Sequence, residues 1–483
     1  MSQRRKSLKP LEPENMDDTE PENNIDNSNM VISKMATLYA EKIMSDIILV
    51  VGNAEYPSHK LILCASSDVF QIMLHDSNWS ESSQKRVTLG ETPSCAAVFE
   101  DFLKYLYTGK IHLDFATVVP IVSLADKYNV KDLLKLGLDF MKRNISTACK
   151  KNQVVSWFQL TLASGHSHIS EMCSNFIKAN FELVSKTIDF PNMEPELLVS
   201  LIKSNDLVIE DELKLFECIS SWLKAKKSIM INGGEENVNL HFDRYVDMLL
   251  PHVRFPMMTP NQLAYLLLSP LSQSHTHLIV DRIRMGLNYH KNQIDDVLKN
   301  CDARLFTPRL YTTEIFCASL SVDHFYELPT YHCRSLLFSS QKCIPNYLGQ
   351  DQVEWSVDVY PKGVWFERCL TVYMPSGKEV PGRVLRTVRV SVTTKEPTEN
   401  LRVKIGILVV GHQDNFEHIR CVKTRNYVFG VGDEIVIFDD IVDHDDLIND
   451  KPKSNFFSGE NKTSFKILVT ITPLSKLSSL CVN

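Results

Sequence analysis

The sequence predicts a multidomain protein: an α+β domain, then an all-α domain, then an all-β antiparallel sandwich. A chain of 483 residues is long enough for about three domains. Apolar residues recur at helical spacing through much of the first 290 residues. After Asp302 they alternate with polar residues, which is typical of half-buried strands.

Composition excludes several classes of function. Hydrophobic residues make up 44% and charged residues 23% of the chain, which is ordinary for a globular protein. The net charge of -7 provides no electrostatic support for nucleic-acid binding, and no apolar run is long enough to insert into a membrane. The twelve cysteines are scattered without a Cys-x-x-Cys pair, so we expect free thiols in the cytoplasm. The basic cluster Arg4-Arg5-Lys6 leaves the nucleus open as an alternative.

The N-terminal region combines a polar tail with an amphipathic helix. Residues 1–30 are poor in apolar side chains, so we expect them to be disordered. Between Met30 and Met44 the apolar residues return every three to four positions, which predicts a helix. Its apolar stripe includes Val31, Met35, Leu38, Tyr39 and Ile43.

The following segment predicts a compact α+β domain. Strand Asp46–Val51 is followed by a Gly52-Asn53 hairpin turn and a short strand at Glu55-Tyr56. Further on, the pattern predicts helices at 60–65 and 68–74 with Ser67 as an N-cap, a strand at 85–89, a helix at 94–107 that Gly109 ends, and helices at 115–128 and 131–144.

Several motifs in this segment occur together in one order. They are Tyr56-Pro57-Ser58-His59-Lys60, Trp79-Ser80-Glu81, Tyr105-Leu106-Tyr107-Thr108-Gly109 and Leu124-Ala125-Asp126-Lys127-Tyr128-Asn129. The series resembles a BTB (POZ) domain, which we place at residues 31–146. The resemblance implies a protein-binding module that forms a homodimer, with the stripe from Val31 to Ile43 in the dimer seam. The alternative is that this helix packs only on its own domain.

The loop containing Trp79, Ser80 and Glu81 has a predicted partner. BTB domains that bind cullin-3 carry a large apolar residue, any residue and then Glu in this loop, and this triplet is similar. In such an interface Trp79 would fill a pocket while the Glu81 carboxylate finds donors at its edge. The alternative is that Trp79 caps its own domain and Glu81 is solvated.

Residues 150–290 are predicted to be helical. The segments 197–207 and 211–223 contain an Asp-Leu pair, an acidic pair and a helix that ends near Trp222. They resemble a BACK domain, which implies a helical spacer. Lys224 to Asn239, with Gly233-Gly234, is predicted to be a loop, and Pro251 to Leu287 supplies the last helices.

Residues 302–475 are predicted to form the sandwich. Alternation is clearest around Val357, Val390, Ile405 and Val469. The stretch from Trp355 to Gly363, with Tyr360-Pro361, resembles the opening of TRAF-like (MATH) domains. That resemblance implies a domain that binds a target protein, and a strand edge could hold a target peptide.

The sequence predicts no enzyme. It lacks a phosphate loop, a nucleophile elbow and a metalloprotease motif, so no catalytic, cofactor-binding or metal-binding residues are expected. The acidic run from Asp439 to Asp446 lacks the spacing of a calcium loop. The resemblances imply an adaptor that recruits a ubiquitylation target to a cullin-3 ligase. A BTB scaffold without ubiquitin transfer is the alternative, and the target itself is not identified.

Overall fold

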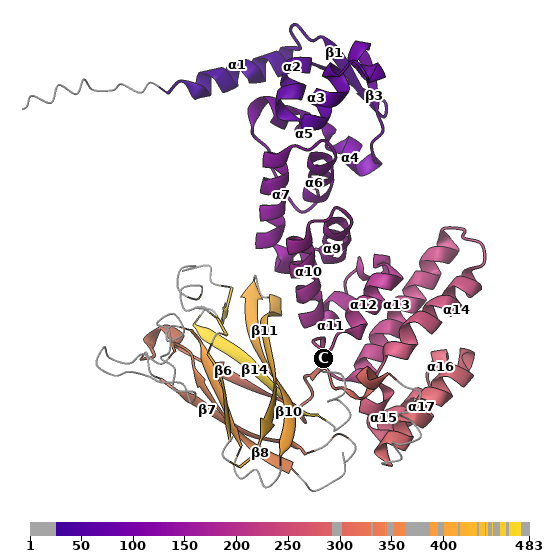
Figure 1. The fold of residues 1–483 in the computed structure, drawn as a ribbon, viewed down its shortest axis with the longest axis vertical. Helices are drawn as coiled ribbons and strands as arrows, with labels where there is room; N and C mark the ends of the chain where they lie inside the picture. The colour runs from indigo at the N-terminus through magenta and orange to yellow at the C-terminus, as the bar shows by residue number, and fades with distance from the viewer. Residues whose placement is uncertain are drawn as a thin grey trace, which may run out of the picture. The chain divides into compact units, whose positions relative to one another are not determined.

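The chain divides into two compact units. The computed structural model describes residues 26–291, 302–329, 332–342, 344, 352–363, 387–394, 400–413, 416–431, 434–439, 441–442, 447, 455–459 and 463–474. The first unit contains residues up to 112 together with 123–131, and the second contains 113–122 and the chain from 132 onward (Figure 1). The predicted tail lies outside the described residues up to position 25, whereas residues 28–30 are helical.

The first unit combines a small sheet with short helices. Strand β1 (Ile47–Val51) pairs antiparallel with β2 (Ala54–Ser58) and parallel with β3 (Arg86–Leu89). Gly52 has φ +57° in the turn between β1 and β2, as a tight hairpin requires. The helices are α1 (Ser28–Glu41), α2 (Lys60–Ser66), α3 (Asp68–His75), η1 (Ser80–Ser83), α4 (Pro93–Ala97) and α5 (Phe99–Thr108).

Two helices of this unit differ in detail from the prediction. The single helix expected at 94–107 is two helices, because Val98 leaves the helical conformation between α4 and α5. Phe99, Phe102, Leu103 and Tyr107 are the buried residues of α5, and Gly109 ends it with φ +63°. The N-cap prediction for α3 is confirmed, since the Ser67 hydroxyl accepts a hydrogen bond from the Phe70 amide at 3.0 Å.

The second unit begins with a stack of helices. The helices are α6 (Val118–Lys127), which the two units share, α7 (Lys131–Arg143), α8 (Ile145–Lys150), α9 (Val154–Ala163), α10 (Ser167–Ala179), α11 (Phe181–Ser185), η2 (Phe190–Asn192), α12 (Pro195–Lys203), α13 (Glu212–Asn232), α14 (Val238–Leu249), η3 (Leu250–His252), η4 (Phe255–Met257), α15 (Pro260–Leu266), α16 (Pro270–Ser274) and α17 (Thr276–His290).

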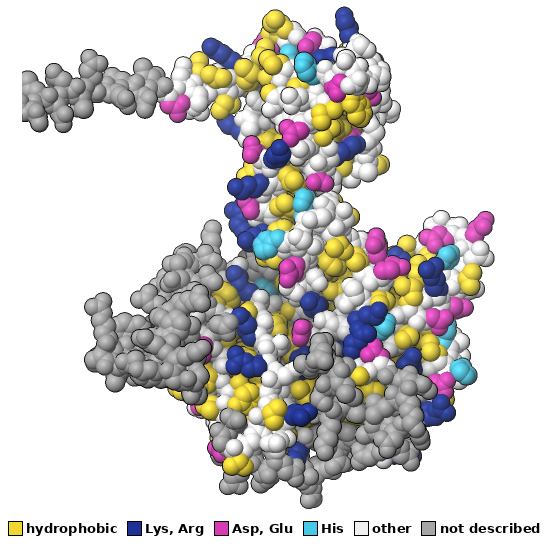
Figure 2. All heavy atoms as spheres, in the orientation of Figure 1, with side chains coloured by type: hydrophobic (Ala, Val, Ile, Leu, Met, Phe, Trp, Pro, Cys, Tyr) yellow, Lys and Arg dark blue, Asp and Glu magenta, His cyan; other side chains and the backbone are white. Residues whose placement is uncertain are grey.

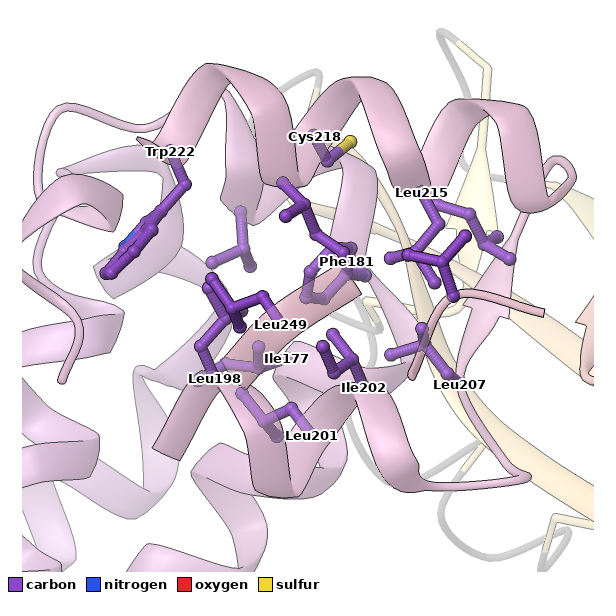
Figure 3. Close-up of a cluster of buried hydrophobic side chains, with 14 of the residues drawn as sticks. Ile177, Phe181, Leu198, Leu201, Ile202, Leu207, Leu215, Cys218, Trp222 and Leu249 are labelled. Carbon is purple, nitrogen blue, oxygen red and sulfur yellow. The ribbon is translucent and has the colours of Figure 1, made fainter. Parts of the chain in front are cut away.

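A continuous apolar core holds these helices together. Figure 3 shows Trp222, Leu215 and Cys218 of α13 above Leu198 and Ile202 of α12. Burying a side chain of this size contributes roughly 1.5–3 kcal/mol each, so helix packing rather than local propensity stabilises the region. Trp222 is fully buried, which agrees with a packing role.

The loop predicted at Lys224 to Asn239 is largely wrong. Helix α13 continues to Asn232 before Gly233 caps it, and α14 begins at Val238. The Lys-Ala-Lys-Lys run consists of good helix formers, and Met230 is buried near the end of the helix. The loop is therefore confined to the few residues around Gly233-Gly234.

The C-terminal region contains two antiparallel sheets among its described strands. One has the order β11-β10-β14-β13, with β6 also on β14, and the other has the order β12-β9-β8-β7. The strands are β6 (Cys317–Val322), β7 (Arg334–Gln341), β8 (Gln352–Tyr360), β9 (Arg389–Thr394), β10 (Leu401–Gln413), β11 (Phe416–Phe429), β12 (Ile435–Phe438), β13 (Phe457–Ser458) and β14 (Ser464–Pro473).

The residues that face the core between the sheets follow the predicted alternation, but β10 is not half-buried as predicted, because its residues 403–411 are buried on both faces. Val357 of β8, Val390 of β9, Ile405 of β10 and Val469 of β14 are fully buried in one cluster. Trp355 lies in the same cluster, and its indole N–H donates to the Ser340 hydroxyl at 2.8 Å. These sheets confirm the predicted fold class. The turn expected at Ser376-Gly377-Lys378 lies outside the described residues.

The start of the C-terminal region packs with the helices. Helix η5 (Ala303–Phe306) and strand β5 (Leu310–Tyr311) precede the sheets, and β5 pairs parallel with β4 (Val208–Ile209) of the helical region. Leu305, Phe306 and Tyr311 belong to the helical core. The segment after Asp302 is therefore shared between the helices and the sheets.

Candidate functional site

The predicted cullin loop is ordered and carries an exposed indole. Trp79 immediately precedes η1, and half of its surface is exposed (50%). The Ser80 hydroxyl donates to the Glu81 carboxylate at 2.8 Å, and Glu81 is half-buried. The structure thus brings Trp79, Ser80 and Glu81 together at the end of α3, with the indole available to a partner.

Backbone contacts fix the shape of this loop. The Trp79 amide donates to the Asp76 carbonyl at 3.1 Å, and the Ser82 hydroxyl donates to the Trp79 carbonyl at 2.7 Å. The Lys60 ammonium of α2 donates to the Ser82 carbonyl at 2.7 Å. Because the loop is already ordered, binding through it would cost little additional conformational entropy.

Two further exposed apolar residues lie on neighbouring helices. Leu61 of α2 and Ile72 of α3 are exposed (78% and 51%), whereas Leu63 and Leu74 on the same helices are buried. Helix α3 packs against both α2 and η1. Sequence reasoning missed Leu61 and Ile72. The signal was present, since apolar residues occupied both faces of short helices that bury only one face.

The predicted dimer stripe lies on a helix with little cover from its own unit. The fourteen described residues of α1 are all exposed or half-buried. Val31 is exposed, and Met35, Leu38 and Tyr39 are half-buried. Ile43 is also exposed, but it lies beyond the helix, which ends at Glu41 and not near Met44 as predicted. Hydrophobic side chains are visible at the surface along α1 in Figure 2. The helix packs on its own domain, as the alternative interpretation requires. It also leaves apolar surface open, as a dimer seam would require.

Tyr39 accounts for the local packing of α1. Its ring centroid lies 5.2 Å from that of Tyr107 on α5, and its hydroxyl donates to the Glu100 carbonyl at 3.4 Å. Burial, with Glu100 next in importance, raises the pKa of Tyr39 to about 12, so the phenol stays neutral.

His59 ties the end of this helix to the same tyrosine. The His59 Nε2 lies 2.7 Å from the Ile43 carbonyl, which can only accept, so Nε2 carries the proton. In the neutral ring, Nδ1 then accepts from the Tyr107 hydroxyl at 2.9 Å. The imidazole has a structural role in holding α1.

A buried polar cluster lies in the second unit, where the helices meet the C-terminal region. Of two adjacent acids, Asp211 caps α13 through the Lys214 amide, whereas Glu212 is fully buried. Glu212 Oε1 accepts from Arg309 Nε at 2.6 Å and from the Tyr311 hydroxyl at 2.8 Å. Glu212 Oε2 accepts from the Arg254 amide at 2.9 Å. This cluster joins positions about a hundred residues apart and was not predicted.

Side chains pair with individual backbone groups on two edge strands of the C-terminal sheets. The Asn180 side chain accepts from the Ile419 amide at 2.6 Å and donates to the Ile419 carbonyl at 2.8 Å on β11. On β12, Arg425 donates to the Ile437 carbonyl and Tyr427 to the Ile435 carbonyl. These particular backbone groups cannot also pair with an added strand, so a peptide would have to pair at other positions.

Within the described residues, no group of three or more His, Cys, Asp or Glu side chains is placed to hold a metal ion. Most of the acidic run from Asp439 to Asp446 lies outside that part of the chain. No helix in the described part is long and apolar enough to cross a membrane.

Comparison with known proteins identifies three domains. Residues 35–145 match the BTB/POZ domain model, residues 154–267 match BACK (BTB And C-terminal Kelch), and residues 306–475 match the BTBD17 TRAF domain. BTB/POZ domain-containing protein 17 of Xenopus laevis is 26% identical over 351 residues, which cover 70% of this chain and 69% of that protein.

Other relatives match shorter stretches of the chain. Galectin-3-binding protein of Bos taurus is 25% identical over 268 residues, covering 54% of this chain and 45% of that protein. Kelch-like protein 40 of Xenopus tropicalis is 26% identical over 182 residues, covering 38% and 28%. The motifs and the matched models agree, and the chain therefore combines a BTB domain, a BACK domain and a C-terminal TRAF domain.

Proposed function

We propose that this protein is a substrate-recruiting adaptor of a cullin-3 ubiquitin ligase. The single observation that carries the proposal is the half-exposed indole of Trp79, presented next to Glu81 on an ordered loop of the BTB domain. Hot-spot residues are typically large side chains in the middle of an otherwise weaker contact surface. Leu61 and Ile72 supply apolar surface on the adjoining helices.

The adaptor acts as a homodimer through α1. Val31, Met35, Leu38 and Tyr39 give this helix an apolar surface that its own unit covers incompletely, and Ile43 extends that surface just beyond the end of the helix. A second copy of α1 is the partner that fits, because a two-fold interface buries the same surface on both chains. Dimerisation also doubles the number of target sites on one adaptor and so raises avidity.

The C-terminal TRAF domain recruits the ubiquitylation target. An extended peptide would pair with a strand edge that the chain's own side chains leave uncovered. We place the protein in the cytoplasm, since Cys149, Cys173 and Cys317 are free thiols. Burial raises the pKa of Cys149, Cys173 and Cys317 to about 12, which makes these thiols unreactive.

Proximity labelling in cells distinguishes an adaptor from a scaffold. The full chain fused to a labelling enzyme is compared with its Trp79→Ala variant, with and without a proteasome inhibitor. An adaptor labels cullin-3 and accumulates additional labelled proteins only when the proteasome is inhibited. The variant should lose both effects. If cullin-3 is not labelled, and the labelled proteins are the same with and without the inhibitor, the protein is a scaffold.

A further inference from the structure

The helical region and the C-terminal sheets meet over a broad surface. The outer side of the five-stranded sheet contributes Leu408, which packs with Leu310 and Val208. Helix α10 lies against β11, as Figure 1 also shows, and the Phe176 ring lies 5.8 Å from that of His418. Ser146 of α8 donates to the Gln413 side chain at the end of β10. Contacts therefore extend from α8 to the β4–β5 pair.

The buried polar cluster lies at one end of this surface. Arg309 donates to the Ser204 carbonyl at 2.7 Å and to the His252 carbonyl at 2.9 Å, in addition to its bond with Glu212. Arg254 donates to the Asn205 side chain at 2.7 Å and to the Thr307 carbonyl. Each arginine thus holds several backbone segments that are distant in sequence.

Lys404 extends the cluster into the sheet. This residue of β10 is 5% exposed, and its ammonium donates to the Asn205 carbonyl at 2.6 Å, with Asp206 at 3.4 Å. The segment from Ser204 to Asp206 is therefore held by Arg254 and Arg309 on one side and by the sheet on the other. Separating the sheet from the helices would break the contacts of Lys404 with Asn205 and Asp206.

We infer that the buried contacts of Glu212, Arg254, Arg309 and Lys404 lock the BACK helices and the TRAF sheets into one rigid, cooperatively unfolding body. The target-binding sheets are then fixed on the helices and do not swing on a linker. Removing one member of a buried charged cluster is costly because the remaining charges stay buried without compensation. This inference does not depend on cullin binding.

Hydrogen exchange of the full chain, measured by mass spectrometry at increasing urea concentrations, tests whether the helices and the sheets unfold together. Peptides from β10 report on the sheets and peptides from α13 report on the helices. In the wild type both should lose protection at the same urea concentration. In Lys404→Met the two midpoints should separate by at least about 0.5 M, because the sheet loses its polar hold on Asn205.

Lys466→Met is the matched control. Lys466 lies on neighbouring β14, and its ion pair with Glu417 at 2.7 Å stays within the sheets. The control should keep a single midpoint. Separate midpoints in the wild type, or identical behaviour of Lys404→Met and Lys466→Met, would overturn the inference. If Lys404→Met does not fold, Lys404→Gln takes its place with the same expected separation.

Discussion

Glu212 and Arg309 form an ion pair of 2.6 Å in which neither side chain has exposed surface. The two residues come from the BACK helices and from the segment that leads into the TRAF sheets. Because the pair is desolvated, its loss has consequences for both regions, unlike the loss of a surface ion pair.

Replacing Glu212 with Ala should lower the free energy of unfolding by roughly 3–5 kcal/mol, since Arg309 would remain buried and unpaired. Chemical denaturation followed by circular dichroism measures the change. Lys214→Met on the same helix is the control, because Lys214 and Glu217 form a partly exposed pair that contributes about 1 kcal/mol or less. Equal changes in the free energy of unfolding would show that the buried Glu212–Arg309 pair contributes no more to stability than the Lys214–Glu217 pair.

Acid should loosen the contact between α10 and β11. Burial lowers the pKa of His418 to about 4, below its usual 6.5. The unfolded chain therefore binds a proton between pH 6.5 and 4 that the folded chain does not, so stability falls as pH falls through this window. His418→Gln should reduce the loss by on the order of 2 kcal/mol. The test compares the denaturation midpoints of wild type and His418→Gln at pH 7 and pH 4.5. An equal loss of stability in the two proteins would show that His418 is not the group responsible.

Asp or Lys at position 38 should weaken the homodimer, because a charge would enter an apolar seam. Light scattering of the full chain at tens of micromolar measures the mass. Thr37→Asp is the control, since Thr37 is exposed and its side chain projects about 100° away around α1. A monomeric wild type would remove the dimer from the proposal, and a dimer unaffected by Leu38→Asp would move the seam elsewhere.

Asn180→Asp should destabilise the cover on β11. A carboxylate can still accept from the Ile419 amide but cannot donate to its carbonyl, so we expect a cost of roughly 1–3 kcal/mol. Exchange of the Ile419 amide and overall stability are the readouts. Asn426→Asp, at an exposed position of the same strand, should change neither. An Asn180→Asp protein as stable as wild type would show that the pairing contributes nothing.

The sequence was most informative where local pattern determines structure. Alternation around Val357 and Ile405 predicted strands, and the Ser67 cap and Gly109 stop followed from local hydrogen bonding and backbone freedom. It was least informative where distant residues meet. Asp211 and Glu212 are adjacent acids with different roles, and only the positions of Arg254 and Arg309 distinguish them.

The site residues show the same contrast between features set by local sequence and features set by contacts between distant residues. Trp79, Ser80 and Glu81 were found because they are contiguous, whereas Leu61 and Ile72 join them only through the packing of α2, α3 and η1. Asn180 could not be predicted, because its partner Ile419 lies 239 positions away.

Titration calorimetry of the full chain with the amino-terminal domain of cullin-3 tests the central claim most directly. The full chain is needed because a fragment ending near residue 290 would leave Glu212 without Arg309 and Tyr311. Wild type should bind, and Glu81→Lys should slow association through repulsion. Trp79→Ala should lose at least about 2 kcal/mol, roughly thirtyfold in affinity, with an unchanged thermal melt. Leu240→Ala, which changes an exposed apolar residue of α14, should bind like wild type.

Normal binding by Trp79→Ala would refute the assignment of Trp79 as the interface anchor. A wild type that does not bind would contradict the adaptor function and favour the scaffold.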